Sequence, residues 1–317
     1  MRPEATLQPV DAVDVTIVVD NSIDILLPST EVAWRSPTLL NWHQRTTLIA
    51  EHGFSLLVTV CKDTRTETIL FDAGLGRETA IHNLDVLGVG VQDLRAVVLS
   101  HGHLDHHGGL VGVVRRVGRA RLPVVLHPDA WRERKTVSPT GEVIHWPPPS
   151  RKQLEREGVE VVEARTPSLL LDGMLLVTGQ IDRVTSFERG TPLQYARTSA
   201  GWEPDGWTWD DQALVLNLKD KGLVVLSSCS HAGIINVLRH ARRLADLRKV
   251  HAVIGGLHLT GDVSEASIAR TIEELSAMNP EIVVPCHCTG WKATHELARR
   301  LPEAYVQPSV GTRVHFA

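Results

Sequence analysis

The chain has 317 residues, of which 43% are hydrophobic and 22% are charged, and its net charge at pH 7 is −4. This composition is typical of a folded globular protein and excludes a disordered chain. No basic stripe stands out, so we expect no nucleic-acid partner. No apolar run approaches the roughly 18 residues that span a bilayer, and the N-terminus lacks the apolar segment of a signal peptide. We therefore expect no membrane partner.

The cysteines also bear on location. There are four, and their number and placement do not suggest a disulfide framework: Cys61, Cys229, Cys286 and Cys288. A reducing cytoplasm fits this pattern, so we expect a cytoplasmic protein. The sequence leaves a homo-oligomer open.

The first part of the chain alternates between strand-like and helical runs. The apolar pattern predicts these segments, in order: strands over 15–20, 55–60 and 68–71, a helix near 77–87, a strand over 96–99, a helix over 111–117 and a strand over 123–127. The strand over 96–99 leads directly into a histidine-rich loop.

The middle of the chain, from about 131 to 211, has a different composition. It contains three consecutive prolines and five of the eight tryptophans, at 131, 146, 202, 207 and 209. Apart from a strand-like run over 169–177, we interpret it as long loops or an insertion over the active site. We assign Trp202, Trp207 and Trp209 to substrate binding, as rings that contact a flat or strongly apolar group. Ordinary core packing of these rings is the alternative.

The second half repeats the alternation. Its pattern predicts a hairpin of strands 213–218 and 222–227, a helix over 233–247, a strand over 251–254, a helix over 264–278, a strand over 281–285, a helix over 291–300 and a last strand near 312–315. Two β-rich halves with helices outside indicate two sheets packed face to face between helical layers. We expect a single domain over residues 1–317.

The histidine-rich loop, His101-Gly102-His103-Leu104-Asp105-His106-His107, is the strongest functional signal. Four imidazoles and a carboxylate in one turn are costly to bury unless they hold cations. Imidazole nitrogen and carboxylate oxygen are ligands that zinc prefers. The spacing of His101 and His103 lets two rings converge on one ion, and Asp105 and His106 then point toward a second position.

Three further histidines follow predicted strands. His231 follows the strand over 222–227, His258 the strand over 251–254, and His287 the strand over 281–285. Sites in α/β folds collect at the carboxyl ends of strands, so we expect these residues to lie near the histidine loop.

The stretch from Leu99 to His106 resembles the signature of the metallo-β-lactamase superfamily. Further motifs resemble one branch of it, whose members are named 7,8-dihydropterin-6-yl-methyl-4-(β-D-ribofuranosyl)aminobenzene 5′-phosphate synthase. These motifs are Asp20-Asn21, Glu51-His52-Gly53, Phe71-Asp72-Ala73-Gly74, Thr178-Gly179-Gln180-Ile181, Cys229-Ser230-His231-Ala232-Gly233, Gly255-Gly256-Leu257-His258-Leu259 and Pro285-Cys286-His287-Cys288-Thr289-Gly290.

The resemblance implies an α/β fold, the metallo-β-lactamase-like αββα sandwich of two mixed β-sheets with outer helices. It also implies that His101 and His103 hold a first metal, that Asp105 and His106 hold a second, and that His287 is the last ligand histidine.

The chain departs from the superfamily at two positions. Many members carry a histidine where Gln180 stands, and a bridging aspartate where Cys229-Ser230-His231 stands. We prefer His231 as the ligand. Cys229 is either a soft ligand or merely buried, and we favour burial. Asp210 or Asp211 is an alternative source of a bridging carboxylate. We interpret Cys286 and Cys288 as packing residues, because alternation along an extended segment points them away from His287.

The remaining candidates have supporting roles. We expect Asp105 to orient or deprotonate the attacking water, and His258 to act as a ligand or as a donor that polarises the substrate. His107 is a candidate for contact with the metal ligands, and Asn21 is assigned to substrate binding.

The predicted function is hydrolysis of an ester, amide or phosphoester bond in a small organic molecule by a metal-bound hydroxide. The predicted cofactors are two divalent ions, with zinc preferred and iron or manganese as alternatives. A synthase (transferase) that joins a dihydropterin to an arylamine is the second reading. A di-iron redox protein and a non-catalytic binding module are further alternatives.

Overall fold

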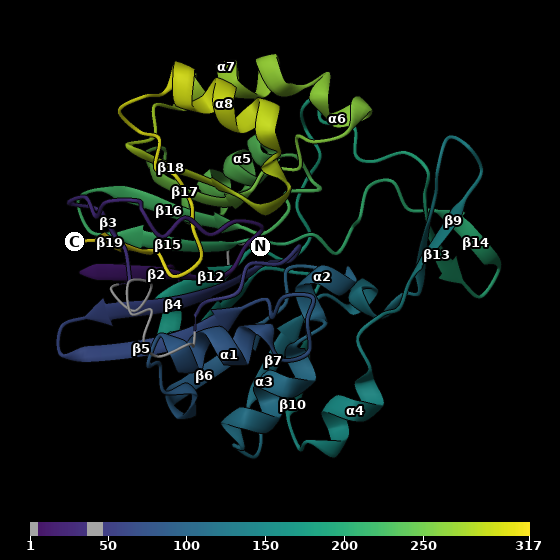
Figure 1. Cartoon of the computed structure of the whole chain (residues 1–317), viewed down its shortest axis with the longest axis horizontal. Helices are drawn as coiled ribbons and strands as arrows, with labels where there is room; N and C mark the ends of the chain where they lie inside the picture. The colour runs from purple at the N-terminus through teal and green to yellow at the C-terminus, as the bar shows by residue number, and fades with distance from the viewer. Residues whose placement is uncertain (1–5, 37–46) are drawn as a thin grey trace.

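Two large β-sheets pack face to face in the computed structural model, which describes residues 6–36 and 47–317 (Figure 1). In the described residues the first sheet has the strand order β10(Glu160–Glu163)-β7(Pro123–Leu126)-β6(Leu94–Val98)-β5(Arg65–Phe71)-β4(Ser55–Lys62)-β2(Ala12–Val19)-β19(Arg313–Phe316)-β3(Ala33–Trp34). It is mixed, because β5, β6, β7 and β10 are parallel to one another and the other pairs are antiparallel.

The second sheet is also mixed. Its order is β11(Ser168–Leu170)-β12(Leu175–Val177)-β15(Leu214–Leu218)-β16(Gly222–Ser227)-β17(Val250–Gly256)-β18(Ile282–Cys286), with β1(Pro9–Val10) paired to β15. The strands β16, β17 and β18 are parallel, so their carboxyl ends meet at one edge of the sheet. The predicted hairpin is confirmed as the antiparallel pair of β15 and β16.

Helices cover the outer face of each sheet (Figure 1). On the first sheet, α1(Thr79–Val86) and α3(Leu110–Val117) bury their apolar residues, and α4(Arg151–Arg156) adds Leu154. On the second sheet lie α5(Ile234–Ala245), α7(Ile268–Met278) and α8(Trp291–Arg300). The apolar cluster between the sheets contains Val15, Phe71, Leu216 and Ile254. The predicted αββα arrangement is therefore confirmed.

Short helices connect several strands. The four-residue helices are α2(Leu104–His107) and α6(Asp262–Glu265), and the 3-10 turns are η3(Val91–Asp93), η4(Pro128–Trp131), η5(Leu171–Gly173) and η6(His287–Thr289). None of the helices in the described ranges combines the length and the apolarity needed to cross a bilayer.

The structure corrects two predicted elements. The run over 169–177 is not one strand, because η5 reverses the chain and pairs β11 with β12 antiparallel. Asp172 has a φ of +55° and Gly173 a φ of +89°, and Asp and Gly tolerate this left-handed conformation best. The predicted helix over 264–278 is interrupted at Ala266–Ser267, which separates α6 from α7.

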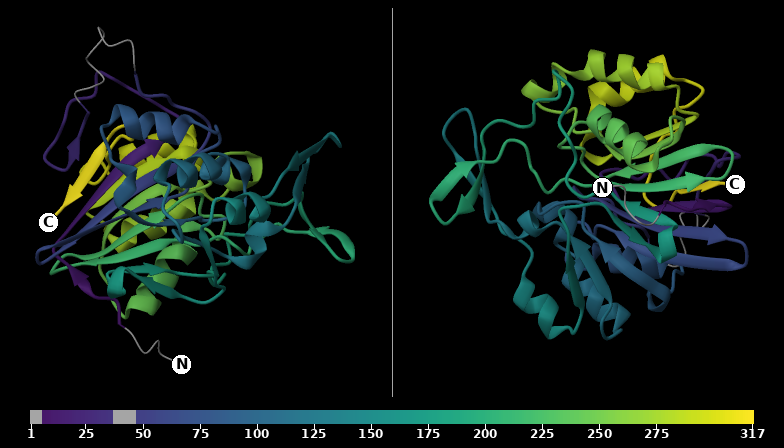
Figure 2. Two further views of the ribbon diagram at one scale, coloured as in Figure 1. Left: turned by 90° about the horizontal axis from the view of Figure 1, so that it is seen from below. Right: turned by 180° about the vertical axis from the view of Figure 1, so that it is seen from behind.

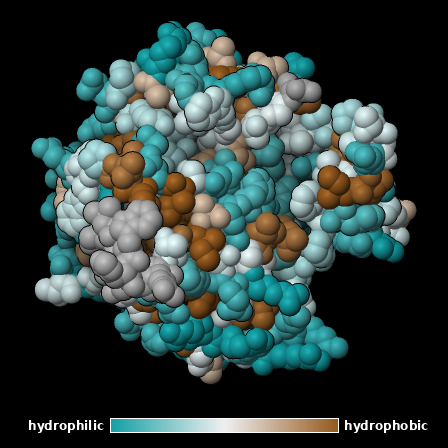
Figure 3. Space-filling model, in the orientation of Figure 1, coloured by the Kyte–Doolittle hydropathy of each residue, from teal (hydrophilic) through white to brown (hydrophobic). Residues whose placement is uncertain are grey.

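The middle of the chain is more regular than its composition suggests. It contributes a third sheet, β14(Gly201–Pro204)-β13(Gln194–Thr198)-β8(Arg134–Val137)-β9(Val143–Trp146), which projects from the sandwich (Figure 2). Figure 3 shows apolar surface on this projection, where Val143 and Ile144 are 49% and 50% exposed. Trp202 lies in β14, so the prediction that it belongs to an irregular loop was wrong.

Candidate metal centre

The histidine loop begins at the end of β6 and is anchored by Asp72. This carboxylate accepts hydrogen bonds from the Ser100 backbone N–H and hydroxyl, each at 2.7 Å, and lies 2.8 Å from His106 Nδ1. The hydroxyl of Ser228 also donates to Asp72. Because Nδ1 of His106 is engaged, its Nε2 is the atom left to bind a cation.

His101 and His103 face each other, as their spacing predicted. His101 Nδ1 lies 2.8 Å from the Ser100 hydroxyl, and His101 Nε2 lies 2.9 Å from His103 Nδ1. Burial, and then the neighbouring imidazoles, lower the pKa of His101 well below its usual value. Burial, and then Arg134, lower the pKa of His103 to about 3. Both rings are therefore neutral at pH 7, which is the form that binds metals.

Asp105 lies at the centre of a second group. Its Oδ2 is 3.3 Å from His287 Nε2, 3.5 Å from His106 Nε2 and 3.3 Å from Nε2 of the exposed His52. Burial acts to raise the pKa of Asp105, but the charge and hydrogen bonds of His106, His287 and His52 hold it well below its usual range.

His106 carries a positive charge in this arrangement. Burial acts to lower the pKa of His106, but Asp105 and Asp72 together raise it to about 10. The carboxylates of Asp72 and Asp105 therefore require a positive charge at the His106 ring, which lies between them. A divalent metal at Nε2 would supply that charge in place of the proton.

The loop after β16 brings the thiol of Cys229 and the imidazole of His231 close to the histidine loop. The ring centroid of His231 lies 4.7 Å from that of His101 and 4.8 Å from that of His103. The side chain of His231 is buried, and neither of its ring nitrogens has a hydrogen-bond partner in the described residues. Cys229 Sγ lies 3.3 Å from His106 Nε2.

Cys229 is shared by three groups whose ligand atoms lie close enough to hold an ion. The groups are His101–Cys229–His231, His106–Cys229–His287 and Cys229–His258–Cys288, and a fourth group is His52–Asp105–His287. Within each group the candidate ligand atoms lie within 4.8 Å of one another. The first group contains His101, and the second contains His106 and His287, whereas His103 belongs to none of the four groups among the described residues.

His287 is held by the N-terminal motif. The backbone N–H of His287 donates to Asp20 Oδ1 at 2.7 Å, and its Nδ1 lies 2.9 Å from Asn21 Oδ1. Asn21 Nδ2 also donates to the His287 carbonyl at 3.2 Å. Both ends of the Asn21 amide thus contact His287 and orient it, while its assignment to substrate binding stays a prediction.

The turn after β18 explains why Cys288 was misinterpreted. His287 has a φ of +48° and begins η6, so side chains no longer alternate beyond Cys286. Cys286 packs between the two sheets as expected, but Cys288 turns toward Cys229 and His258. Burial acts to raise the pKa of Cys288, whereas Cys229, His287 and His258 hold it well below its usual range. Cys288 is therefore part of the site and not a packing residue.

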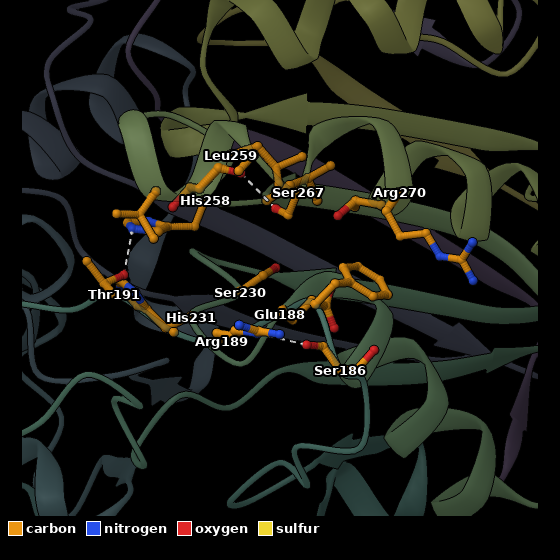
Figure 4. Close-up of a pocket in the computed structure, with 18 residues that line it drawn as sticks. Ser186, Glu188, Arg189, Thr191, Ser230, His231, His258, Leu259, Ser267 and Arg270 are labelled. Atoms are coloured by element: carbon orange, nitrogen blue, oxygen red, sulfur yellow. Dashed lines mark hydrogen bonds between the residues drawn. The ribbon is translucent and has the colours of Figure 1, made fainter.

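His258 lies at the wall of a cavity of about 380 Å³ (Figure 4). Its Nε2 is 3.3 Å from the Thr191 hydroxyl, while its Nδ1 is buried without a hydrogen-bond partner in the described residues. His231 also lines this cavity, together with Arg189 and Ser267. The cavity therefore gives access to the histidine cluster from the side of His231.

The other predicted residues lie outside the four groups. His107 Nε2 lies 3.2 Å from the Pro147 carbonyl, so it ties the middle segment to α2. Asp210 binds Arg134 and the Gly102 N–H, and Asp211 accepts the Ala232 N–H at 2.8 Å. Neither aspartate belongs to a candidate metal group among the described residues, which removes support for a bridging carboxylate there.

The three tryptophans do not act as one unit. The Trp202 ring packs against Lys135 and His145 on the third sheet. Trp207 and Trp209 lie 6.1 Å apart between ring centroids and are 38% and 37% exposed. None of the three lines the cavity at His231 and His258.

Sequence reasoning assigned no role to two residues of the site. Asp72 stands in a motif that carried the resemblance, and its position directly after β5, where parallel strands end, was the available signal. His52 also stands in one of the motifs that carried the resemblance, Glu51-His52-Gly53, but it lies in a loop that follows no strand.

Comparisons with known proteins find similarity in sequence and in fold. Residues 49–173 match the model of the metallo-beta-lactamase superfamily. The chain is 27% identical over 270 residues to the 7,8-dihydropterin-6-methyl-4-(beta-D-ribofuranosyl)-aminobenzene-5'-phosphate synthase of Methanocaldococcus jannaschii, and the match covers 84% of this chain and 90% of that protein. It is 28% identical over 254 residues to an uncharacterized protein of the same organism, with 79% and 88% covered.

The crystal structure of Tm1679, described as a metal-dependent hydrolase of the beta-lactamase superfamily, superimposes with a TM-score of 0.72. The two chains are 23% identical, and the superposition covers 95% of this chain and 98% of that one. At this identity the likeness shows the fold alone, and it confirms the predicted sandwich.

Proposed function

We propose that this chain, which contains a metallo-beta-lactamase superfamily domain, is a metal-dependent hydrolase of an ester, amide or phosphoester bond in a small organic molecule. The observation that carries the proposal is the convergence of two imidazole-containing groups on one shared thiol, Cys229. Such an arrangement suits two neighbouring divalent cations.

The donor atoms fit this cofactor. His101, His103 and His231 would hold one ion, and Asp105, His106 and His287 would hold the other, with Cys229 between them. The two buried ring nitrogens of His231 make no hydrogen bond in the described residues. A buried polar atom without a partner costs roughly 1–3 kcal/mol, which a bound cation removes. Nitrogen, oxygen and thiolate together favour zinc, with iron next and manganese least favoured.

When bound, two such ions would polarise the scissile group and the attacking water. Asp105 Oδ2 is the base of the site, since it is ionised and lies among three imidazoles. Its contact with His52 Nε2 at 3.3 Å, where His52 is 66% exposed, offers a route for the proton to bulk solvent. The Asp72 carboxylate orients His106, and Asn21 orients His287. Asp105 is therefore not needed to orient these two rings.

Substrate reaches these groups through the cavity at His231 and His258. The Thr191 hydroxyl and His258 lie on its wall and can donate hydrogen bonds to a substrate carbonyl or phosphoryl oxygen. We retain Trp207 and Trp209 as candidate contacts for a flat or apolar part of the substrate, because both rings are partly exposed and their centroids lie 6.1 Å apart.

The second candidate function is synthesis. The 27% identity to a dihydropterin–arylamine synthase over most of both chains favours it. In that reaction the same site would bind a phosphorylated arylamine and a pterin, and it would join carbon to nitrogen rather than admit water.

All four cysteines are free in the structure. Free buried thiols are kept in reducing compartments, which supports our proposal that the protein works in the cytoplasm.

One experiment separates the two functions. The protein purified from zinc-supplemented and iron-supplemented cultures is analysed for metal and then assayed with p-nitrophenyl acetate, bis(p-nitrophenyl) phosphate and an amide analogue. In parallel it is incubated with ribofuranosylaminobenzene phosphate and a dihydropterin whose 6-methyl carbon carries a diphosphate leaving group, and the products are identified by mass. Hydrolysis that disappears in His103→Ala supports the first proposal. A coupled pterin–arylamine product without hydrolysis supports the second, and less than one bound metal per chain overturns both.

A further inference from the structure

Two cysteines from separate parts of the chain meet beside the candidate metal centre. Cys229 Sγ and Cys288 Sγ are 3.2 Å apart, although 59 residues separate them in sequence. Both are free thiols, and their exposed fractions are only 3% and 6%. The proposed hydrolysis needs Cys229 as a ligand but assigns no role to Cys288.

The fold brings the two sulfur atoms together through β17, which lies between the strands that carry them. A Cβ on Gly256, the last residue of β17, would lie 2.7 Å from Cys288 Sγ and 2.3 Å from the Ser228 carbonyl. Only glycine leaves room there for the two loops to approach. The left-handed conformation of His287 then turns Cys288 toward Cys229.

We propose that Cys229 and Cys288 are a redox-active pair, which a small hydroperoxide converts to a disulfide that removes Cys229 from the metal centre. A disulfide requires an S–S distance of about 2.05 Å, so the two sulfur atoms need to approach by roughly 1 Å. Side-chain rotation in two loops supplies a movement of that size. Hydrogen peroxide can enter through the cavity that reaches Ser230, His231 and His258, which directly adjoin the two cysteines.

The chemistry balances with one peroxide molecule. One thiolate attacks a peroxide oxygen, the O–O bond breaks, and a sulfenic acid and water form after a proton is taken up. The second thiol then attacks the sulfenic sulfur, the S–O bond breaks, and a second water leaves. Two thiols thus lose two electrons and two protons to one peroxide, and a dithiol reductant reverses the step by thiol–disulfide exchange.

A disulfide sulfur is no longer a thiolate, and the thiolate is the form that ligates metals. Cys229 is common to the groups His101–Cys229–His231 and His106–Cys229–His287, so its oxidation weakens both positions together. This consequence for the metal rests on the proposed function, whereas formation of the disulfide does not.

The test treats the full-length protein with hydrogen peroxide, blocks the remaining thiols by alkylation and measures the intact mass. Wild type is expected to lose two alkylation sites and two hydrogen atoms. Trypsin then yields a linked pair of peptides, 222–239 and 271–292, the second of which contains both Cys286 and Cys288. Cys286→Ser is the matched control, because Cys286 is an equally buried thiol that packs between the sheets.

Cys286→Ser is expected to form the link as wild type does, and Cys288→Ser is expected to lose it. Fragmentation of the linked wild-type peptide between residues 286 and 288 locates the bridge without any variant, which covers the case that Cys288→Ser fails to fold. A bridge to Cys286, sulfenic or sulfinic acid without a link, or no reaction would overturn the proposal.

Release of metal is followed in the same samples with a colorimetric chelator. We expect release in step with the link and recovery after dithiothreitol and added zinc. If the Cys229–Cys288 disulfide forms completely and the protein keeps all of its metal, the proposed coupling between oxidation and metal release is wrong. If the disulfide forms in protein that never bound metal, the proposed function is contradicted, but the proposal of a redox-active cysteine pair stands.

Discussion

The carboxylate of Asp72 orients His106: its Oδ2 lies 2.8 Å from His106 Nδ1, and both side chains are fully buried. This contact determines which ring nitrogen faces the site. A carboxylate behind a ligand histidine also raises the basicity of the ring, so its loss weakens metal binding without removing a ligand.

We therefore expect Asp72→Asn to lower metal affinity by about 10–100-fold, because the amide cannot hold His106 as the carboxylate does. Competition with a chelator of known affinity measures this. Asp63→Asn is the control, since Asp63 also has a positive φ, +52° against +61° at Asp72, but is exposed. Equal metal affinity in the two variants would contradict the role of Asp72.

His103→Ala and Asp105→Ala are each expected to abolish turnover while the chain still folds. The first removes the imidazole whose Nδ1 lies 2.9 Å from His101 Nε2, and the second removes the base and a ligand. Circular dichroism, metal content and turnover should be measured on the same samples. Near-normal activity in either variant would disprove its assignment.

Cys229 and His231 can be separated by spectroscopy. In protein loaded with cobalt, a thiolate ligand gives a near-ultraviolet charge-transfer band. We expect the band in wild type and in Cys286→Ser, and its loss in Cys229→Ser, because Cys229 belongs to three of the candidate groups. His231→Ala is expected to bind less cobalt, while the cobalt that remains bound still shows the band. A band that survives in Cys229→Ser would leave His231 as the sole ligand from this loop.

Asp20 makes the stability of the metal-free protein depend on pH. Burial raises the pKa of Asp20 to about 6, above the roughly 3.9 of an unfolded aspartate. Between these values the folded state holds a proton that the unfolded state has released, so the contribution of Asp20 to stability is greatest below about pH 4 and falls as the pH rises to about 6.

Asn at position 20 has no charge to bury and keeps the oxygen that accepts the His287 N–H. Asp20→Asn is therefore expected to be more stable than wild type at pH 7 by up to about 3 kcal/mol, with the difference vanishing near pH 4. Urea unfolding at the two pH values measures it, with the exposed Asp93→Asn as control. A difference that is the same at both pH values would disprove the titration of Asp20.

Trp207→Ala is expected to raise KM or lower kcat/KM while metal content and fold stay unchanged. The ring is 38% exposed beside Trp209, so it offers an apolar face to a substrate. Trp291→Ala removes another exposed tryptophan, 77% exposed, at the start of α8 and serves as the control. If Trp207→Ala unfolds and its remaining folded fraction has unchanged kinetics, Trp207 is a packing residue and does not contact substrate.

The sequence alone determined the layered fold and the first half of the site. Apolar runs of strand length and helical runs are local patterns, and they predicted most elements of both large sheets. His101, His103, Asp105 and His106 lie within six residues directly after a strand, so local geometry brings them together whatever the rest of the chain does. The placement of His231 and His287 also followed, because parallel strands carry their carboxyl ends to one edge.

Only the tertiary structure decided what lies around those candidate ligands. The direction of Cys288 depends on the left-handed turn at His287, which an alternating pattern does not reveal. The contacts of Asn21 with His287 and of Cys229 with Cys288 join segments 266 and 59 residues apart. Trp202 pairs into a projecting sheet rather than covering the site. Such contacts depend on how distant segments pack, and that packing is set by the whole core rather than by the residues that meet.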